Sequence, residues 1–261
     1  NNELAVSNVV GSNIFNLMFV IGVCSILTPI MVQKATVVRD IPLSLGCALL
    51  LLVLGISGLG DKAGMTLGHA DGIIFLIVFA GYIFTMVRSA MKARAAGQKV
   101  EIEGVEECDN MKELSYGKSI LFLIVGAAAI AFGGDLTVDT ASRIAIELGM
   151  SQTLVGLTIV SIGTSLPELV TSVVAARKNE VDMAVGNAVG SNIFNILMVL
   201  GISSAISPVA LIRENLIDIV LLMVFSVMVW IFAGTRKKIE RKEGIIMVVV
   251  YLVYCAYIIA R

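Results

Sequence analysis

Two clusters of oxygen-bearing side chains interrupt apolar segments in the second half of the sequence. The first cluster lies in SIGTSLPE and comprises Thr164, Ser165 and Glu168; the second lies in GNAVGSNIFN and comprises Asn187, Ser191, Asn192 and Asn195. Hydroxyl, amide and carboxylate oxygens are the ligands of hard cations such as Ca²⁺, which takes about 6–8 of them. No Cys or His accompanies either cluster, so they do not indicate soft-metal chemistry. The two clusters therefore predict a site for a hard cation.

The spacing of the first cluster suits a helix that is broken at one point. Thr164 and Ser165 precede Glu168 by four and three residues, so all three side chains share one helical face. Pro167 has no N–H and cannot continue the ladder, which leaves the carbonyl of Gly163 without its helical partner. A free carbonyl at membrane depth is tolerated where it lines a cavity, and it would add another oxygen ligand.

The composition places these clusters in a membrane protein. Of the 261 residues, 57% are hydrophobic and 15% are charged, whereas a soluble domain has about 25% charged residues. Several apolar runs reach the roughly 20 residues that a helix needs to cross a bilayer. The sequence thus predicts an all-α, polytopic membrane protein.

Eight membrane segments can be read from the apolar runs, and the third of them looks short. They are Asn8–Met31, Ile41–Leu59, Gly72–Val87, Tyr116–Gly134, Ser151–Ala176, Met183–Ser207, Leu216–Ala233 and Gly244–Ala260. An amphipathic stretch, Asp135–Leu148, continues the fourth segment. The predicted division is residues 1–90 for the first structural repeat, 91–115 for a cytoplasmic linker and 116–261 for the second repeat.

Lysine and arginine are unevenly divided between the two sides of this arrangement. Fifteen of the nineteen fall on the side that holds the hydrophilic linker, and four fall on the other. Because cytoplasmic loops carry an excess of basic residues, the linker side is predicted to be cytoplasmic. We expect a multi-pass protein of a prokaryotic inner or plasma membrane.

The motif GSNIFN occurs twice, at Gly11–Asn16 and at Gly190–Asn195. Alignment of Leu4–Ile30 with Met183–Val209 gives 14 identities over 27 positions, which general hydrophobic bias would not produce. The first, second and third segments therefore repeat as the sixth, seventh and eighth. The sixth segment comes five segments after the first, an odd number, so the copies cross the membrane in opposite directions, as in inverted-repeat transporters with a midplane site.

The inverted repeat also predicts what the rest of the protein contains. Two segments precede the second copy, so two should precede the first, which gives a ten-helix protein built as five plus five. We expect the 261-residue sequence to be an N-terminally truncated piece of it, with two missing N-terminal helices needed to complete the site.

Both copies of the motif contribute candidate ligands. Ser12 and Asn16 are four residues apart, as are Ser191 and Asn195, so each pair points in one direction. Ser, Thr and Asn in membrane helices also serve simply as interhelical hydrogen-bonding groups, and this is the preferred reading for Asn13 and Asn192. Glu168 differs, because an ionisable residue in a membrane helix costs about 2.5 kcal/mol or more and is functional by default.

These motifs resemble the signatures of a known family. Gly163–Glu168 (GTSLPE) and Gly186–Asn195 (GNAVGSNIFN) resemble the second signature repeat of the sodium/calcium exchanger family, and Asn8–Asn16 (NVVGSNIFN) resembles the latter half of the first. The resemblance spans the whole chain and is greatest to prokaryotic calcium/sodium antiporters. It implies a ten-helix inverted-repeat fold in which Na⁺ and Ca²⁺ compete for central sites.

The resemblance also implies a ligand set. It comprises the side chains of Thr164, Ser165, Glu168, Ser12, Asn16, Ser191 and Asn195 and the backbone carbonyl of Ser161. Family members differ between Asp and Asn at the last position of the GSN motif, and this chain has Asn in both copies. The first GTS-x-P-E motif, with its own Glu, is not present in these residues. A divalent site with Glu168 as its sole carboxylate is short of charge, so this stretch alone is not expected to exchange Ca²⁺.

The leading hypothesis is a secondary antiporter that exports Ca²⁺ against an inward Na⁺ gradient by alternating access. Ca²⁺/H⁺ exchange, with protonation of Glu168, is the close alternative, and K⁺ co-transport stays open. A passive cation channel or a non-transporting membrane subunit is the alternative from another class. No nucleophile–base pair or cofactor motif occurs, so neither an enzyme, a cofactor nor a nucleic-acid partner is expected; the partners are Ca²⁺, Na⁺ and the lipid bilayer.

Overall fold

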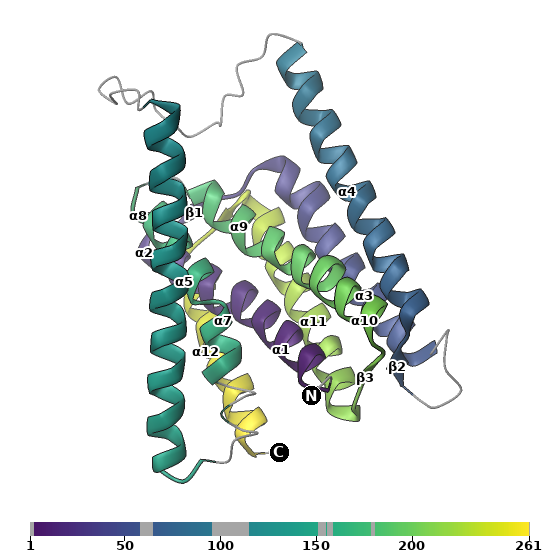
Figure 1. Cartoon of the computed structure of the whole chain (residues 1–261). Coiled ribbons are helices and arrows are strands. Elements are labelled where there is room, and N and C mark those ends of the chain that lie inside the picture. Colours follow the sequence, from purple (N-terminus) through teal and green to yellow (C-terminus); the bar gives the residue numbers. More distant parts are fainter. Residues whose placement is uncertain are drawn as a thin grey trace.

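The computed structural model describes residues 3–57, 65–95, 115–150, 155, 159–178 and 181–260. They form a layered bundle in which two broken helices cross near the centre and longer helices flank them (Figure 1). Apart from four two-residue strands, all regular structure in this part of the chain is helical. This confirms the prediction of an all-α polytopic membrane protein.

The first repeat contributes three long helical elements. The first runs through α1 (Glu3–Ile14), the π-helical η1 (Phe15–Val20) and α2 (Ile21–Leu27). Strand β1 (Ile30–Met31) leads to η2 (Thr36–Asp40) and α3 (Ile41–Ser57), and strand β2 (Thr66–Leu67) leads to α4 (His69–Ala95).

The second repeat begins with α5 (Tyr116–Glu147), α7 (Ser161–Thr164) and α8 (Leu166–Arg177). Its copy of the first helix comprises α9 (Val181–Phe194), the π-helical η4 (Asn195–Leu200) and α10 (Gly201–Ile206). Strand β3 (Val209–Ala210), α11 (Arg213–Arg236), strand β4 (Lys238–Ile239) and α12 (Arg241–Ala260) complete the chain.

Seven helices of the described residues are long and apolar enough to cross a membrane. The predicted fifth segment, Ser151–Ala176, is instead divided: α7 and α8 meet at Ser165, and residues 151–154 and 156–158 lie outside the described part. The expected short third helix was wrong, because α4 has 27 residues. Its last eight residues, RSAMKARA, are mostly strong helix formers, so the helix continues past its apolar portion. Most of the predicted linker, residues 96–114, lies outside the described residues.

The two copies of the first helix are related by inversion in space. In Figure 1 the α1–α2 element and the α9–α10 element run in opposite directions across the middle of the bundle. Both widen into a π-helical stretch at the same place in the repeat, η1 containing Asn16 and η4 beginning at Asn195. A π-helical turn holds an extra residue and often marks a functional site.

Two short antiparallel ribbons join the repeats. Strand β1 of the first repeat pairs with β4 of the second, with Ile30 opposite Ile239. Strand β2 of the first repeat pairs with β3 of the second, with Leu67 opposite Val209. Neither ribbon was predicted, since two-residue strands leave no periodic pattern in a sequence. Each two-stranded ribbon therefore contains one strand from each repeat.

Glycines allow the third helix of each repeat to contact the first helix of the other. A Cβ placed on Gly72 of α4 would lie 2.3 Å from the amide nitrogen of Ala205 and 2.7 Å from the carbonyl oxygen of Gly201, both in α10. A Cβ on Gly244 of α12 would lie 2.7 Å from the carbonyl oxygen of Gly22 in α2. Small residues of this kind let membrane helices approach closely.

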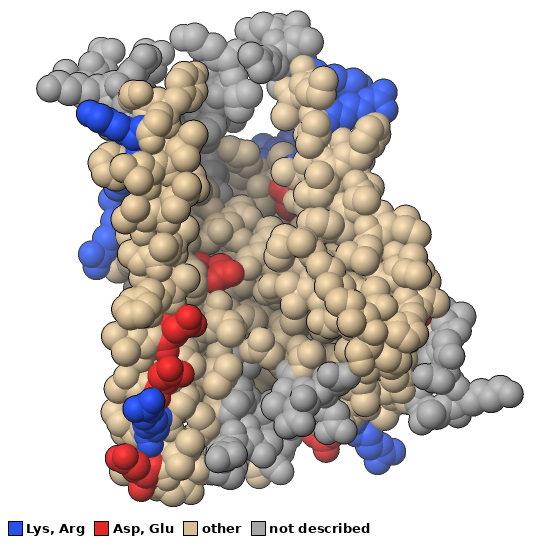
Figure 2. Space-filling model, viewed as in Figure 1, with Lys and Arg blue, Asp and Glu red and all other residues tan. Residues whose placement is uncertain are grey.

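Burial differs sharply between the central and peripheral helices. In the helix that runs from Ala5 to Leu27, 78% of the most apolar part is buried in the protein. None of the most apolar part of α5 is buried. The motif-bearing helices therefore form the core, and α5 lies at the edge. In Figure 2, Lys and Arg gather toward the upper end of the view, where α4 ends and α5 begins, while Asp and Glu lie along the lower half of α5.

Substitution of Gly72 by alanine tests the packing of α4 on α10. The added Cβ would meet backbone atoms that cannot move without moving the helix, and overpacking of this kind costs about 1–3 kcal/mol. Gly72→Ala should therefore lower the midpoint of thermal unfolding in detergent. Gly81→Ala on the same helix is the matched control, because nothing lies within 4 Å of its added Cβ. Equal midpoints for the two variants would contradict the packing argument.

Candidate functional site

The SIGTSLPE segment forms a helix break at Ser165. Helix α7 ends at Thr164, Ser165 adopts φ −102° and ψ 6°, and α8 begins with Leu166 and Pro167. This conformation lies close to the bridge region of backbone space, where many active-site residues are found. The amide of Ser165 donates to the carbonyl of Ile162 at 3.0 Å, which tightens the last turn of α7. The interruption expected from Pro167 is present, but it lies at Ser165, and Pro167 is in the first turn of α8.

Hydroxyl groups from both repeats meet at this break. Ser12 Oγ makes a short hydrogen bond with Ser165 Oγ and lies 3.3 Å from Thr164 Oγ1. Thr164 Oγ1 also donates to Asn8 Oδ1 at 3.4 Å. Ser12 and Ser165 are buried, whereas Thr164 is exposed, so this group of oxygens reaches from the interior of the bundle to its surface. The candidate ligands Ser12, Thr164 and Ser165 are therefore brought together by α1 and the α7–α8 break.

Glu168 lies one turn further along and faces the second GSNIFN motif. Its Oε1 accepts a hydrogen bond of 2.7 Å from Ser191 Oγ on α9. Its Oε2 is buried and has no hydrogen-bond partner among the described residues. An unsatisfied carboxylate oxygen in an apolar interior is costly, so this atom is expected to face an ion or a donor group supplied from elsewhere.

Asn187 fixes α8 to α9 beside the carboxylate. Its Nδ2 donates to Thr171 Oγ1 at 3.0 Å, to Ser172 Oγ at 3.1 Å and to the backbone carbonyl of Glu168 at 3.4 Å. Asn8 occupies the equivalent position in the first repeat and contacts Thr164 instead. These two asparagines hold the ligand-bearing helix from both repeats, and neither is in the predicted ligand set.

Four asparagines form a two-fold network where α1 and α9 cross. Asn13 Nδ2 donates to the carbonyl of Asn192 at 3.2 Å, and Asn192 Nδ2 donates to the carbonyl of Asn13 at 3.1 Å. Asn16 Nδ2 donates to Asn192 Oδ1 at 3.1 Å, and Asn195 Nδ2 donates to Asn13 Oδ1 at 3.1 Å. The interhelical role predicted for Asn13 and Asn192 is confirmed. Asn16 Oδ1 is buried without a hydrogen-bond partner in the described part of the chain, so it is an unused acceptor beside this network.

The predicted ligand set is thus divided into neighbouring groups. One contains Ser12, Thr164 and Ser165, the second contains Glu168 and Ser191, and the third contains Asn16 and Asn195 with their asparagine partners. Ser161 lies in α7, and its side chain is outside the described structure. Among described residues, no group of three or more His, Cys, Asp and Glu gathers into a metal cluster. The oxygens are hydroxyls, amides and one carboxylate.

Helix α5 contacts the break from outside. A Cβ on Gly163, the residue before Thr164, would lie 1.8 Å from Val138 Cγ2, and Gly134 of α5 faces the carbonyl of Gly163. This close approach was missed, because it depends on packing rather than on a motif.

Buried polar residues of α11 were also missed. Asp218 is 5% exposed within an apolar run, and an ionisable residue there was a visible signal.

Gly163→Ala is expected to weaken cation binding in the full-length protein. The added Cβ must displace α5 or the turn that carries Thr164 and Ser165, and ligands need placement to about 0.5 Å. We expect the Na⁺ or Ca²⁺ concentration that gives half of the cation-dependent rise in unfolding temperature to increase about tenfold, or about 1.4 kcal/mol. Adding Val138→Ala should restore much of the affinity, while Gly133→Ala, with nothing near its Cβ, should have little effect. Failure of the double variant to recover would refute this role of the contact.

Both the sequence and the fold are similar to those of known proteins. The family profile described as "Sodium/calcium exchanger protein" matches residues 1–88 and 118–260, which include both GSNIFN motifs and the helix break. The inner membrane protein YrbG of Escherichia coli is 32% identical over 236 residues, covering 87% of this chain and 69% of that protein. The sodium/calcium exchanger MaX1 of Methanosarcina acetivorans is 29% identical over 275 residues, covering 96% and 79%.

A solved structure shows the same arrangement of helices. The sodium-calcium exchanger NCX_Mj, soaked with 10 mM Na⁺ and zero Ca²⁺, superimposes with a TM-score of 0.75 at 32% sequence identity, covering 98% of this chain and 77% of that one. The family profile spans most of the chain, and the fold agrees. The protein is therefore a multi-pass membrane transporter, not an enzyme, and belongs to the sodium/calcium exchanger family.

Proposed function

We propose that the protein is a secondary antiporter that exchanges Ca²⁺ for Na⁺ by alternating access at a midplane site of oxygen ligands. The observation that carries this proposal is the Glu168 carboxylate, whose Oε2 is buried without a hydrogen-bond partner among the described residues. Hydroxyl and amide oxygens from both inverted motifs surround the same region. A buried anion among neutral oxygens can hold a hard cation that has lost its water.

The proposed ligands come from the three broken helices, α1–α2, α7–α8 and α9–α10. They are the side chains of Ser12, Asn16, Thr164, Ser165, Glu168, Ser191 and Asn195, with the backbone carbonyl of Ser161. Hydrogen bonds join several of these oxygens to one another, as between Ser191 Oγ and Glu168 Oε1. A hydroxyl can rotate its proton away and offer a lone pair, so the same groups can pair with each other or ligate a cation.

Competition for these oxygens supplies the coupling between the two ions. Na⁺ and Ca²⁺ both favour oxygen ligands, so occupation by one ion excludes the other from the same atoms. Glu168 neutralises a single positive charge, which suits Na⁺ better than Ca²⁺. We infer that a second carboxylate comes from two further helices of the whole protein, the counterparts in the first repeat of α5 and α7–α8.

Glu168→Ala in the full-length protein should abolish Ca²⁺ transport while leaving membrane insertion intact. Removing one partner of a buried charge pair costs about 3–5 kcal/mol, so transport should fall at least about 100-fold. Glu214→Ala, an exposed glutamate in the first turn of α11, is the matched control and should transport normally. Uptake of ⁴⁵Ca²⁺ into Na⁺-loaded vesicles measures the effect. Transport that survived Glu168→Ala would refute the site assignment.

The identity of the counter-ion is tested by imposing one gradient at a time. We expect Ca²⁺ uptake into vesicles of the full-length protein to follow a Na⁺ gradient and to be unaffected by a pH gradient without Na⁺. Uptake driven by the pH gradient would instead support Ca²⁺/H⁺ exchange. Flux that followed the Ca²⁺ gradient alone would indicate a passive channel, and absence of any flux would indicate a non-transporting subunit.

A further inference from the structure

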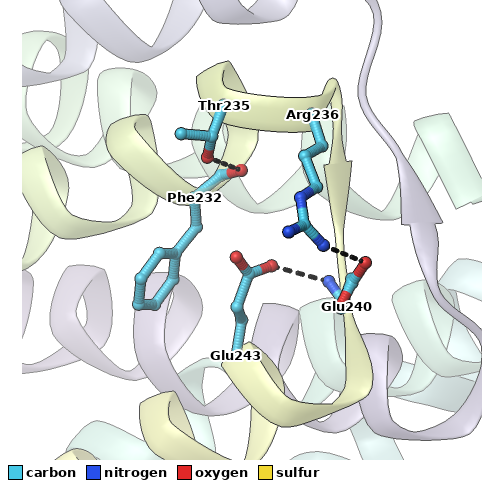
Figure 3. Close-up of polar contacts among 5 residues, drawn as sticks. All are labelled: Phe232, Thr235, Arg236, Glu240 and Glu243. Atoms are coloured by element: carbon cyan, nitrogen blue, oxygen red, sulfur yellow. Dashed lines mark hydrogen bonds and ion pairs between the residues drawn. The ribbon is translucent and has the colours of Figure 1, made fainter.

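The turn between α11 and α12 is rich in basic residues that the cation site does not use. Residues 236–242 contain five Lys or Arg, and the carboxylates nearby are Glu240 and Glu243. Both carboxylates are already engaged, as Figure 3 shows. Arg236 Nη1 donates to Glu240 Oε1 at 2.9 Å, and Glu243 Oε2 accepts a 2.7 Å hydrogen bond from the backbone amide of Glu240 at the start of α12.

The other four cations of the turn lack an acidic partner. Lys237, Lys238, Arg241 and Lys242 form no ion pair with any described residue. Three of them are exposed, and Lys238 is partly exposed. Arg241 reaches the carbonyl oxygen of Leu27 at 3.5 Å, which brings its charge over the end of α2. The result is a patch with a net positive charge, which we name the ribbon patch.

The ribbon backbone holds this patch in place. Lys238 lies in β4 opposite Met31 of β1, and the amide of Val32 donates to the carbonyl of Lys237 at 2.9 Å. Lys237 has a left-handed backbone with φ 51°, which ends α11 and turns the chain into β4. Lys34 is exposed and follows strand β1 closely in the sequence, so it adds a positive charge near the β1 strand of the ribbon.

The fold itself does not need this charge, because the twin ribbon lacks it. The β2–β3 ribbon has the same antiparallel pairing and joins the equivalent elements of the two repeats. In its described surroundings, residues 65–72 and 205–214, Arg213 is the sole Lys or Arg. Two ribbons of the same architecture therefore differ in charge, as expected for the basic and the opposite side of a membrane protein, so the pairing of the strands does not itself require the charge of the ribbon patch.

Exposed apolar side chains border the patch. Met31, opposite Lys238, is 56% exposed and Leu27 is 40% exposed. A surface that carries both cations and exposed apolar groups suits the boundary between lipid tails and headgroups. Clusters of basic residues beside membrane helices attract anionic lipids on the cytoplasmic side, at about 1 kcal/mol for each charge near the surface. We propose that the ribbon patch binds the phosphate headgroups of anionic phospholipids in the leaflet on the basic side of the protein.

Trp230 provides an intrinsic probe of this surface. It is the one tryptophan of the sequence and lies six residues before Arg236 on α11, about 9 Å along the helix axis. Its indole N–H donates to the carbonyl of Val37 at 2.8 Å, which holds the ring beside η2, and 38% of the residue is exposed. Phospholipids brominated near the headgroup quench such a ring on contact, so quenching reports which lipid lies beside the patch.

The test uses the full-length protein, with Trp230 as its sole tryptophan after replacement of any other by phenylalanine, in vesicles that contain equal amounts of phosphatidylcholine and phosphatidylglycerol. Trp230 should be quenched more strongly when phosphatidylglycerol carries the bromine than when phosphatidylcholine does. The variant Lys238→Gln/Arg241→Gln/Lys242→Gln should lose this difference, because the preference falls roughly fivefold for each charge removed. Lys238→Arg/Lys242→Arg keeps the charge and should keep the difference, which separates loss of charge from loss of fold.

The matched control removes the same charge elsewhere on the basic side. Arg88→Gln/Lys92→Gln/Lys118→Gln alters the ends of α4 and α5 and should leave the quenching difference unchanged. Equal loss in both triple variants would mean that the lipids respond to the charge of the whole face, and this would overturn the proposal. So would equal quenching by the two brominated lipids in the unmodified protein. Neither outcome bears on which ions are transported, so the proposal stands or falls apart from the exchange function.

Discussion

The reciprocal amide pairing of Asn13 and Asn192 determines where the two inverted helices cross. At membrane depth there is no water to satisfy a polar group, so each amide must find its partner inside the protein. Here each asparagine side chain satisfies the backbone of the other, which fixes both the separation and the register of α1 and α9. The candidate ligands Ser12 and Ser191, each one residue before these asparagines, are consequently both placed against the α7–α8 segment, Ser12 at Ser165 and Ser191 at Glu168.

The crossing also leaves acceptor oxygens unused beside a network of neutral side chains. The asparagine network is satisfied on its donor side, while the Asn16 Oδ1 and Glu168 Oε2 acceptors are buried without hydrogen-bond partners in the described structure. Surplus acceptors in a protein interior carry a free-energy cost that a cation can relieve. The crossing provides rigidity and the break at Ser165 provides irregular backbone, and candidate ligands lie on both.

Much of this arrangement could be predicted from the sequence, because it depends on repeated motifs and on the position of a proline. The GSNIFN duplication predicted the inverted pair, and Pro167 predicted the break, because both act through local chemistry. The contact of Val138 with Gly163 could not be predicted, since it depends on how far α5 leans against the core. The extent of α4 was misjudged because an apolar run marks the membrane portion of a helix, and α4 continues beyond it to Ala95.

The ribbons have a consequence for how the protein is made. Strand β1 leaves the ribosome well before its partner β4, because most of the described helices lie between them in the sequence. The first helices therefore enter the membrane before the strand that closes their end exists, and contacts so distant in sequence form slowly. Closure of this end of the bundle must wait until β4 has been made, so the second repeat completes the assembly of the first.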